Sequence, residues 1–151
     1  MKCAEMIETE IETDPVVAVD NRQVVRLPMG LLGFEQFKEY VLLSNLDEAP
    51  FRWLRVQDNS ALAFVVIDPF LVLPDYSPDI PKPDVEFLKL KAPSDAMLLG
   101  IVTIHEAGRA TMNLKGPVVI NRHTLVGRQV IIANANNYSV THPLPAAESS
   151  D

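Results

Sequence analysis

Three histidines, His105, His123 and His142, are the side chains whose type could bind a metal ion or transfer a proton. A zinc site needs several such ligands close together, and spacings of two or four residues place two side chains on one face of a strand or helix. The histidines show neither spacing, and Cys3, the single cysteine, lies near the amino terminus, far from all of them. We therefore expect no metal site, no cofactor and no intramolecular disulfide.

Two carboxylates, Asp75 and Asp79, flank Tyr76 and could act as a general acid and base. Hydrolysis by such a pair requires both groups to be held rigidly across a cleft, whereas these two lie in a proline-rich stretch. The chain also contains no serine in a G-x-S-x-G setting, the turn that exposes the nucleophile of many hydrolases. We expect that the chain is not an enzyme.

Gly30 and Gly33 form a G-x-x-G pair of the kind that clamps phosphates in some RNA-binding modules. The two residues between them are leucines, and a phosphate clamp needs nearby positive charge. The pair is therefore interpreted as a turn.

The net charge of −7 is distributed unevenly, with −6 in residues 1–50, −2 in 51–100 and +1 in 101–151. An acidic surface repels phosphate backbones, so we expect no direct nucleic-acid binding and instead a basic protein partner. A surface that only keeps the protein in solution is the alternative explanation. The acidic start, MKCAEMIETEIETD, lacks the apolar run of a signal peptide, and no segment approaches the roughly 20 apolar residues of a membrane helix. We expect a cytoplasmic location without membrane binding.

Alternation of apolar and polar residues dominates over helical periodicity along the chain. Helical signals are few. The segment 32–37 is consistent with a single turn set by Gly33. The segment 84–90, with an acid at its start, a lysine near its end and Pro93 beyond it, indicates a short helix, although it also alternates like a strand. Many short strands joined by turn residues predict an all-β fold, a small antiparallel β-barrel or barrel-like sandwich of about eight to ten strands with one or two short helices. The expected strands are 22–27, 40–44, 52–57, 62–67, 97–105, 111–115, 118–121 and 127–133.

We expect one domain over residues 1–145 and a disordered tail over 146–151, because the tail has nothing to bury. The alternation also predicts which apolar side chains form the core. These residues are Trp53, Leu62, Phe64, Val66, Ile101, Val119 and Ile131.

Apolar residues continue beyond the Asp68-Pro69 stop, where Phe70 to Leu73 and then Tyr76 occupy an expected loop. Such a loop either packs back on the barrel or presents an exposed apolar patch with an acidic rim, as a protein-docking surface does.

Four stretches together resemble the flagellar assembly factor FliW family, in the family's order and over residues 27 to 144. They are LPMGLLGFE at 27–35, FRWLRVQDNSALAFVVIDPF at 51–70, LLGIVTIHE at 98–106 with MNLKGPVVIN at 112–121, and GRQVII at 127–132 with HPL at 142–144. The chain departs from the family pattern at Leu27, Arg55-Val56 and Ser60, and the part before Asn21 matches poorly.

The resemblance implies a cytoplasmic adaptor with two mutually exclusive partners. Such proteins bind flagellin and also bind the carbon storage regulator (CsrA), a small RNA-binding translational repressor, and so relieve repression of flagellin translation. We expect a monomer. Two alternatives stay open: a small-molecule-binding β-barrel or enzyme with an unrecognised pocket, and a flagellin chaperone without a regulatory partner.

The expected partner surface combines aromatic anchors with amides that offer donors and acceptors without the desolvation cost of charge. For the two asparagines, which bracket the Gly116-Pro117 turn, satisfying local backbone groups is an equally supported role. The expected partner-binding residues are Asp68, Phe70, Asp75, Tyr76, Asn113, Lys115 and Asn121.

Overall fold

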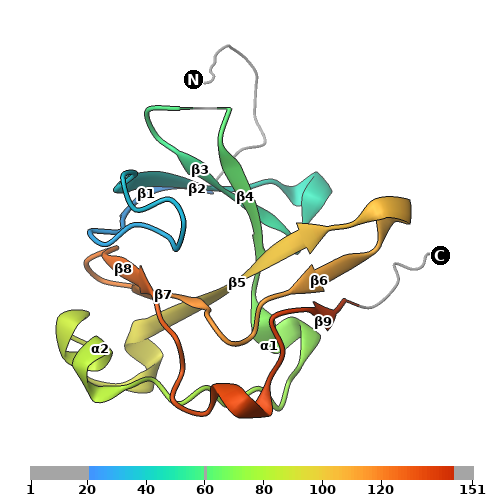
Figure 1. Cartoon of the computed structure of the whole chain (residues 1–151). Helices are drawn as coiled ribbons and strands as arrows, with labels where there is room; N and C mark the ends of the chain where they lie inside the picture. The colour runs from blue at the N-terminus through green and yellow to red at the C-terminus, as the bar shows by residue number, and fades with distance from the viewer. Residues whose placement is uncertain (1–20, 60, 145–151) are drawn as a thin grey trace.

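The computed structural model describes residues 21–59 and 61–144, which form nine β-strands and two short α-helices (Figure 1). Cys3 and the expected disordered tail lie outside the described residues. The strands are β1 (Asn21–Arg26), β2 (Glu39–Ser44), β3 (Arg52–Val56), β4 (Ala63–Ile67), β5 (Ala96–Ile104), β6 (Ala110–Met112), β7 (Val118–Asn121), β8 (Gly127–Gln129) and β9 (His142–Pro143), and the helices are α1 (Pro69–Val72) and α2 (Lys82–Phe87).

All strand pairs in the sheet are antiparallel, which confirms the expected all-β class. The strands follow the order β1-β2-β3-β4-β5-β6-β9, and β7 pairs with both β5 and β8. The long strand β5 joins two parts of the sheet, because its first half pairs with β7 and its second half with β4 and β6. An isolated parallel bridge between Arg26, at the end of β1, and Val126, just before β8, connects the two ends of the sheet, but the strands form no continuous ladder there. The fold is therefore a barrel-like sandwich that is not closed.

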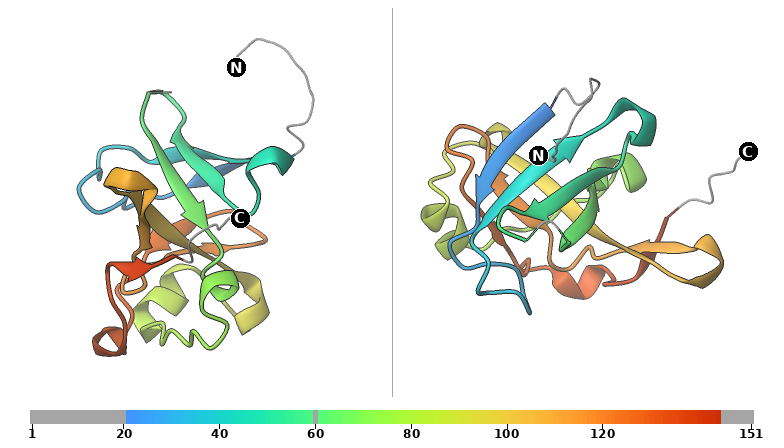
Figure 2. Two further views of the ribbon diagram at one scale, coloured as in Figure 1. Left: turned by 90° about the vertical axis from the view of Figure 1, so that its right-hand side faces the viewer. Right: turned by 90° about the horizontal axis from the view of Figure 1, so that it is seen from above.

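The interior between the strands is filled by aliphatic side chains from alternate positions, as expected when one face of each strand is buried. A second cluster lies between β5, β6 and the segment after α1, and a third under α2. Figures 1 and 2 show both helices at one end of the molecule, away from the β3–β4 turn. The buried residues of the interior cluster are Val25, Leu27, Leu31, Tyr40, Leu42, Leu54, Val56, Val66, Leu99, Val118 and Ile120.

Two of the seven predicted core residues are on the surface. Trp53 is 38% exposed and Ile131 is 54% exposed, whereas Val66 and Val119 are fully buried. Leu62, Phe64 and Ile101 are partly buried against the interior cluster. Ile131 points outward because the residues on either side of it, Val130 and Ile132, are buried. Trp53 lies on the outer face of β3, where its Nε1 donates to Glu48 at 3.1 Å.

Several elements end earlier than the sequence pattern predicts. Strand β6 stops at Met112 because the Asn113 carboxamide oxygen accepts from the backbone amides of Lys115 and Gly116, which turns the chain. Strand β8 stops at Gln129, although Val130 N still donates to Pro117 O at 2.9 Å. Helix α2 starts before Asp84 and ends at Phe87, because Lys89 adopts a positive φ of 57°.

The G-x-x-G pair forms the turn that was expected between β1 and β2. Gly30 has a φ of 69°, and a Cβ there would meet Glu35 Cα at 2.5 Å. Only glycine fits this left-handed and crowded position, so its role is to build the turn.

Candidate protein-docking site

Helix α1 begins at the point where the sequence predicted an irregular apolar loop. The Asp68 carboxylate accepts from Phe70 N at 2.8 Å and caps the helix, while Pro69 occupies the first helical position, where no amide donor is needed. The resulting single turn leaves Phe70 41% exposed and Leu71 62% exposed. The structure thus holds two of the loop's apolar side chains at the surface.

Tyr76, expected as an exposed aromatic anchor, is only 4% exposed. Its hydroxyl donates to Leu114 O at 2.6 Å, and its ring lies 5.8 Å from that of Phe70 and 4.9 Å from that of Tyr138. Burial raises the pKa of Tyr76 far above the ordinary tyrosine value, and the neighbouring Tyr138 raises it further. Tyr76 therefore supports the surface around Phe70 from below and offers little area to a partner.

The segment after Tyr76 is tied to the chain between β8 and β9 by four hydrogen bonds. Ser77 N donates to the Tyr138 hydroxyl at 3.0 Å, and Ala133 N donates to Asp79 O at 2.7 Å. Asn134 accepts from Asp79 N and donates to Ser77 O, each at 2.8 Å. The proline-rich stretch is thus held in one conformation, and Asp75 is exposed beside it.

An open groove of about 500 Å³ runs between α1 and α2. Its walls are mostly apolar, with Lys91 as the charged residue among them. Phe70 and Tyr76 are the two predicted site residues that line it. The other lining residues are Ser77, Pro78, Ile80, Val85, Leu90, Ala92, Pro93, Ala96 and Leu98.

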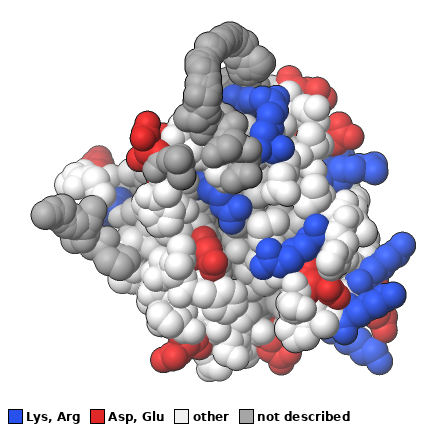
Figure 3. All heavy atoms as spheres, turned by 180° about the vertical axis from the view of Figure 1, so that it is seen from behind, with Lys and Arg blue, Asp and Glu red and all other residues white. Residues whose placement is uncertain are grey.

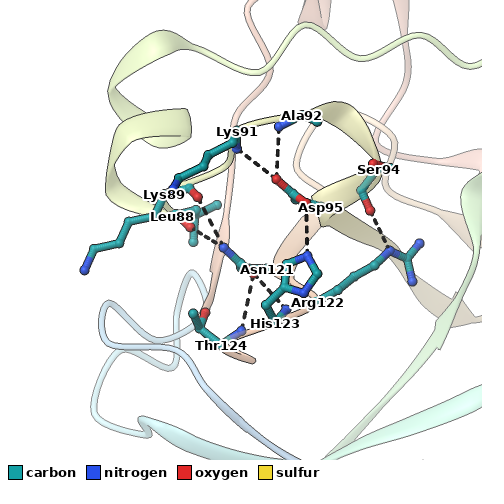
Figure 4. A network of polar contacts seen from close by, with 10 residues as sticks. All are labelled: Leu88, Lys89, Lys91, Ala92, Ser94, Asp95, Asn121, Arg122, His123 and Thr124. Carbon is teal, nitrogen blue, oxygen red and sulfur yellow. Dashed lines mark hydrogen bonds and ion pairs between the residues drawn. The ribbon is translucent and has the colours of Figure 1, made fainter.

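The two asparagines of the predicted site both satisfy backbone groups. Asn113 builds the turn after β6, next to half-buried Lys115. Asn121 is 3% exposed and holds α2 against the turn between β7 and β8 (Figure 4). Its amide donates to Leu88 O at 2.8 Å and Lys89 O at 3.4 Å, and its oxygen accepts from His123 N and Thr124 N. Asn121 lies away from the groove lining and does not face solvent.

A carboxylate, Asp95, organises the chain next to Asn121 (Figure 4). It accepts from the backbone amides of Lys91 and Ala92, each at 3.0 Å, and from His123 Nε2 at 3.0 Å. These hydrogen bonds hold the pKa of Asp95 below its ordinary value, and the bond from the Lys91 amide has the largest effect. The contacts fix the segment that forms one wall of the groove.

The acidic excess of the chain lies outside the described part. Residues 1–20 hold six acids and one base and residues 145–151 hold two acids, which leaves twelve acids and twelve bases in the described part. Figure 3 shows both signs interspersed over one face, with lysine and arginine side chains gathered at the end that carries α2. The expectation of an acidic body is therefore wrong for the described part, which is neutral.

Comparison with known proteins identifies the relatives of this fold. The family model described as FliW protein matches residues 9–144. This chain belongs to the FliW family. The flagellar assembly factor FliW of Leptospira interrogans (strain Fiocruz L1-130) is 36% identical over 132 residues, which cover 85% of this chain and 88% of the relative. That of Treponema denticola is 35% identical over 141 residues, covering 93% and 95%.

A crystal structure of the flagellar assembly factor FliW matches with a TM-score of 0.72 and 37% identity, over 83% of this chain and 87% of that chain. The match to the FliW model also begins at residue 9, so the part before Asn21 fits the family further than the sequence motifs indicated. The relatives are named for flagellar assembly.

Sequence reasoning missed the residues that hold this FliW-family groove in place. Tyr138 and Asn134 lie in an irregular segment, and no local pattern connects them with Ser77 and Asp79, which precede them by 61 and 55 residues. The turn residues of the run ANANNY at 133–138 were the available signal, since such residues bind backbone groups.

The histidines and acids of the described residues do not gather into a metal site. In the described part, no group of three or more His, Cys, Asp or Glu could hold a metal ion. His105 Nε2 lies 2.8 Å from the Thr111 hydroxyl, and His123 contacts Asp95. The interior cluster is aliphatic apart from Tyr40, which argues against a ligand pocket inside the barrel. No helix among the described residues is long and apolar enough to span a membrane.

Proposed function

We propose that this protein is a cytoplasmic flagellar assembly factor that binds flagellin and antagonises the translational repressor CsrA by partner switching. When bound to the repressor, it relieves repression of flagellin translation, and accumulating flagellin displaces the repressor. The protein acts as a monomer without catalysis, cofactor, membrane binding or direct nucleic-acid binding. The match of the FliW family model to residues 9–144 is the observation that carries the proposal.

The groove between α1 and α2 fits a protein partner better than a small molecule. Small-molecule sites usually combine an apolar cavity with a few convergent polar groups that fix the ligand. Here Phe70 and Leu71 project beside an open apolar surface, and the nearby backbone amides of Ser77 and Asp79 already donate to side chains of this chain. We therefore place the flagellin contact at Phe70, Leu71 and the groove, with Asp68 and Asp75 on the same stretch of chain. Lys115 is a further proposed contact residue.

The test is a pair of binding measurements and one competition, using the full chain with flagellin and CsrA from the same organism. Calorimetry should show binding to each partner, and added flagellin should release CsrA from the complex. In a second assay, the chain should lower CsrA binding to the flagellin messenger leader, and flagellin should restore it.

The outcomes separate the alternatives. Binding to flagellin without binding to CsrA would leave a chaperone without a regulatory partner. Binding to neither would refute the proposed function. Simultaneous binding of both partners with no change in affinity would refute partner switching, because exclusive partners must lower each other's affinity.

A further inference from the structure

A second hollow, of about 320 Å³, lies at a different place from the groove and shares no lining residue with it. Strands β1, β2, β3 and β5 and the turn after β7 each contribute to its walls, so that several elements fix its shape. Two of its lining residues are arginines, Arg52 and Arg122. The other lining residues are Gln23, Ser44, Met97 and Leu125.

Arg52 is half-buried in β3 and has no strong acceptor in the described part of the chain. Among the described residues, the hydrogen-bond partner of its two terminal nitrogens is the Met97 sulfur, at 3.9 and 4.0 Å, and a thioether is a weak acceptor. Burial lowers the pKa of Arg52, the charge of Arg122 lowers it further, and Asp68 opposes both. A guanidinium in such surroundings gains from any anion that reaches it.

Arg122 is held by its backbone and by one side-chain nitrogen. Its backbone amide donates to Asp95 O at 2.8 Å, and its Nε donates to Ser94 O at 3.1 Å (Figure 4). Its two terminal amino groups have no hydrogen-bond partner among residues 21–59 and 61–144. The side chain is therefore pre-positioned, and its strongest donors are available to a ligand.

We propose that the hollow between Arg52 and Arg122 binds a peptide carboxylate. Guanidinium groups match a carboxylate geometrically, because parallel N–H donors meet its two oxygens. Asp68 opposes the positive charge around Arg52, and with it the three charges sum to +1, which one carboxylate balances and a phosphate dianion would exceed. The apolar atoms of Met97 and Leu125 fit the stem of an acidic side chain.

Two sources can supply this carboxylate. The first is the chain's own amino-terminal segment, since residues 1–20 contain six acids and join β1 at Asn21, whose strand partner Ser44 lines the hollow. The second is an acidic segment of another protein. The site is defined by the two arginines in both cases, and it does not depend on the binding of flagellin.

The test uses arginine side-chain NMR signals of the full chain and a synthetic peptide with the sequence of residues 5–20. The acidic peptide should shift the Arg52 and Arg122 Nε–H signals saturably, and the same peptide with amides in place of its acids should not. Arg52→Gln and Arg122→Gln should each weaken binding about tenfold or more. Arg109→Gln, at an exposed arginine outside the hollow, is the matched control and should leave binding unchanged.

A full-length variant with amides in place of the six acids of residues 1–20 distinguishes the sources. If the chain's own carboxylates occupy the hollow, this variant should bind the added peptide more tightly than the wild type. Equal affinities assign the carboxylate to another protein. The proposal is overturned if neither full-length form shows saturable shifts, or if the amide peptide shifts the signals equally. Because Arg122 is exposed, Arg122→Gln decides the matter even if Arg52→Gln does not fold.

Discussion

The Tyr76 hydroxyl donates a hydrogen bond of 2.6 Å to the carbonyl oxygen of Leu114, 38 residues further along the chain. This bond connects the segment after α1 with the connection between β6 and β7. Both residues are nearly inaccessible, at 4% and 1% exposure. The floor of the groove is thus part of the second core cluster, and groove shape and domain stability depend on the same side chain.

Tyr76→Phe should lower the free energy of unfolding by about 1–2 kcal/mol, because Leu114 O would lose its partner in a buried place. Tyr76→Ala should cost about 3–5 kcal/mol, since it also removes a buried ring. Urea unfolding measures both, with Val140→Ala at a half-exposed site as the control. A loss below about 0.5 kcal/mol for both variants would show that the ring is not packed as described.

Asn121→Ala should lower the free energy of unfolding by about 2–3 kcal/mol, because it removes four hydrogen bonds to the backbone around a buried site. Asn113→Ala is the matched control and should cost about 1 kcal/mol, since Asn113 is less buried and accepts two backbone hydrogen bonds. Hydrogen exchange should accelerate at Leu88 and Lys89 in the first variant alone. Equal exchange rates at Leu88 and Lys89 in the two variants would show that Asn121 does not hold the end of α2.

Phe70→Ser and Leu71→Ser should each weaken flagellin binding about tenfold, roughly 1.4 kcal/mol, while leaving the protein folded. Leu32→Ser is the matched control, because Leu32 is 59% exposed and Leu71 is 62% exposed, and Leu32 does not line the groove. Calorimetry measures the affinities. If all three variants bind flagellin like the wild type, the contact lies elsewhere.

Asp95 should contribute to stability above about pH 4 and lose this contribution in more acidic solution. Its folded-state pKa is lowered, chiefly by the Lys91 amide, so the folded protein takes up the proton less readily than the unfolded chain does. The stability difference between wild type and Asp95→Asn should therefore be constant near neutral pH and shrink as pH falls through the lowered pKa. Urea midpoints at several pH values test this, with Asp58→Asn as the exposed control.

Salt should weaken the antagonism of CsrA, and the amino-terminal acids should account for that dependence. The described part is neutral, so any repulsion of RNA phosphates must come mainly from residues 1–20, screened over about 10 Å at 0.1 M salt. Replacing the six acids there by amides should remove the salt dependence, whereas Glu106→Gln should not. Antagonism that is independent of salt and of these acids would leave steric blocking or a shape change as the mechanism.

The sequence by itself determined the all-β class, most strand positions and the family, because alternation and turn residues are local signals. The period of two along β3 separates Trp53 from Leu54 and Val56, but it does not say which face is buried. Trp53 was predicted to be in the core and is exposed, whereas Leu54 and Val56 face the interior. Local pattern failed where tertiary contacts override it. Tyr76 looks like an exposed loop residue, yet Leu114, Tyr138 and Phe70 surround it in the folded chain.

Only the tertiary structure decided what the candidate site is. The groove forms where α1 and α2 meet β5, and the hollow forms where Arg52 of β3 approaches Arg122 after β7, 70 residues later. No spacing rule links such positions, since chain folding and not sequence distance brings them together. The number of acids can be counted from the sequence, but only the structure delimits the described part, residues 21–59 and 61–144, in which acids and bases are equal in number.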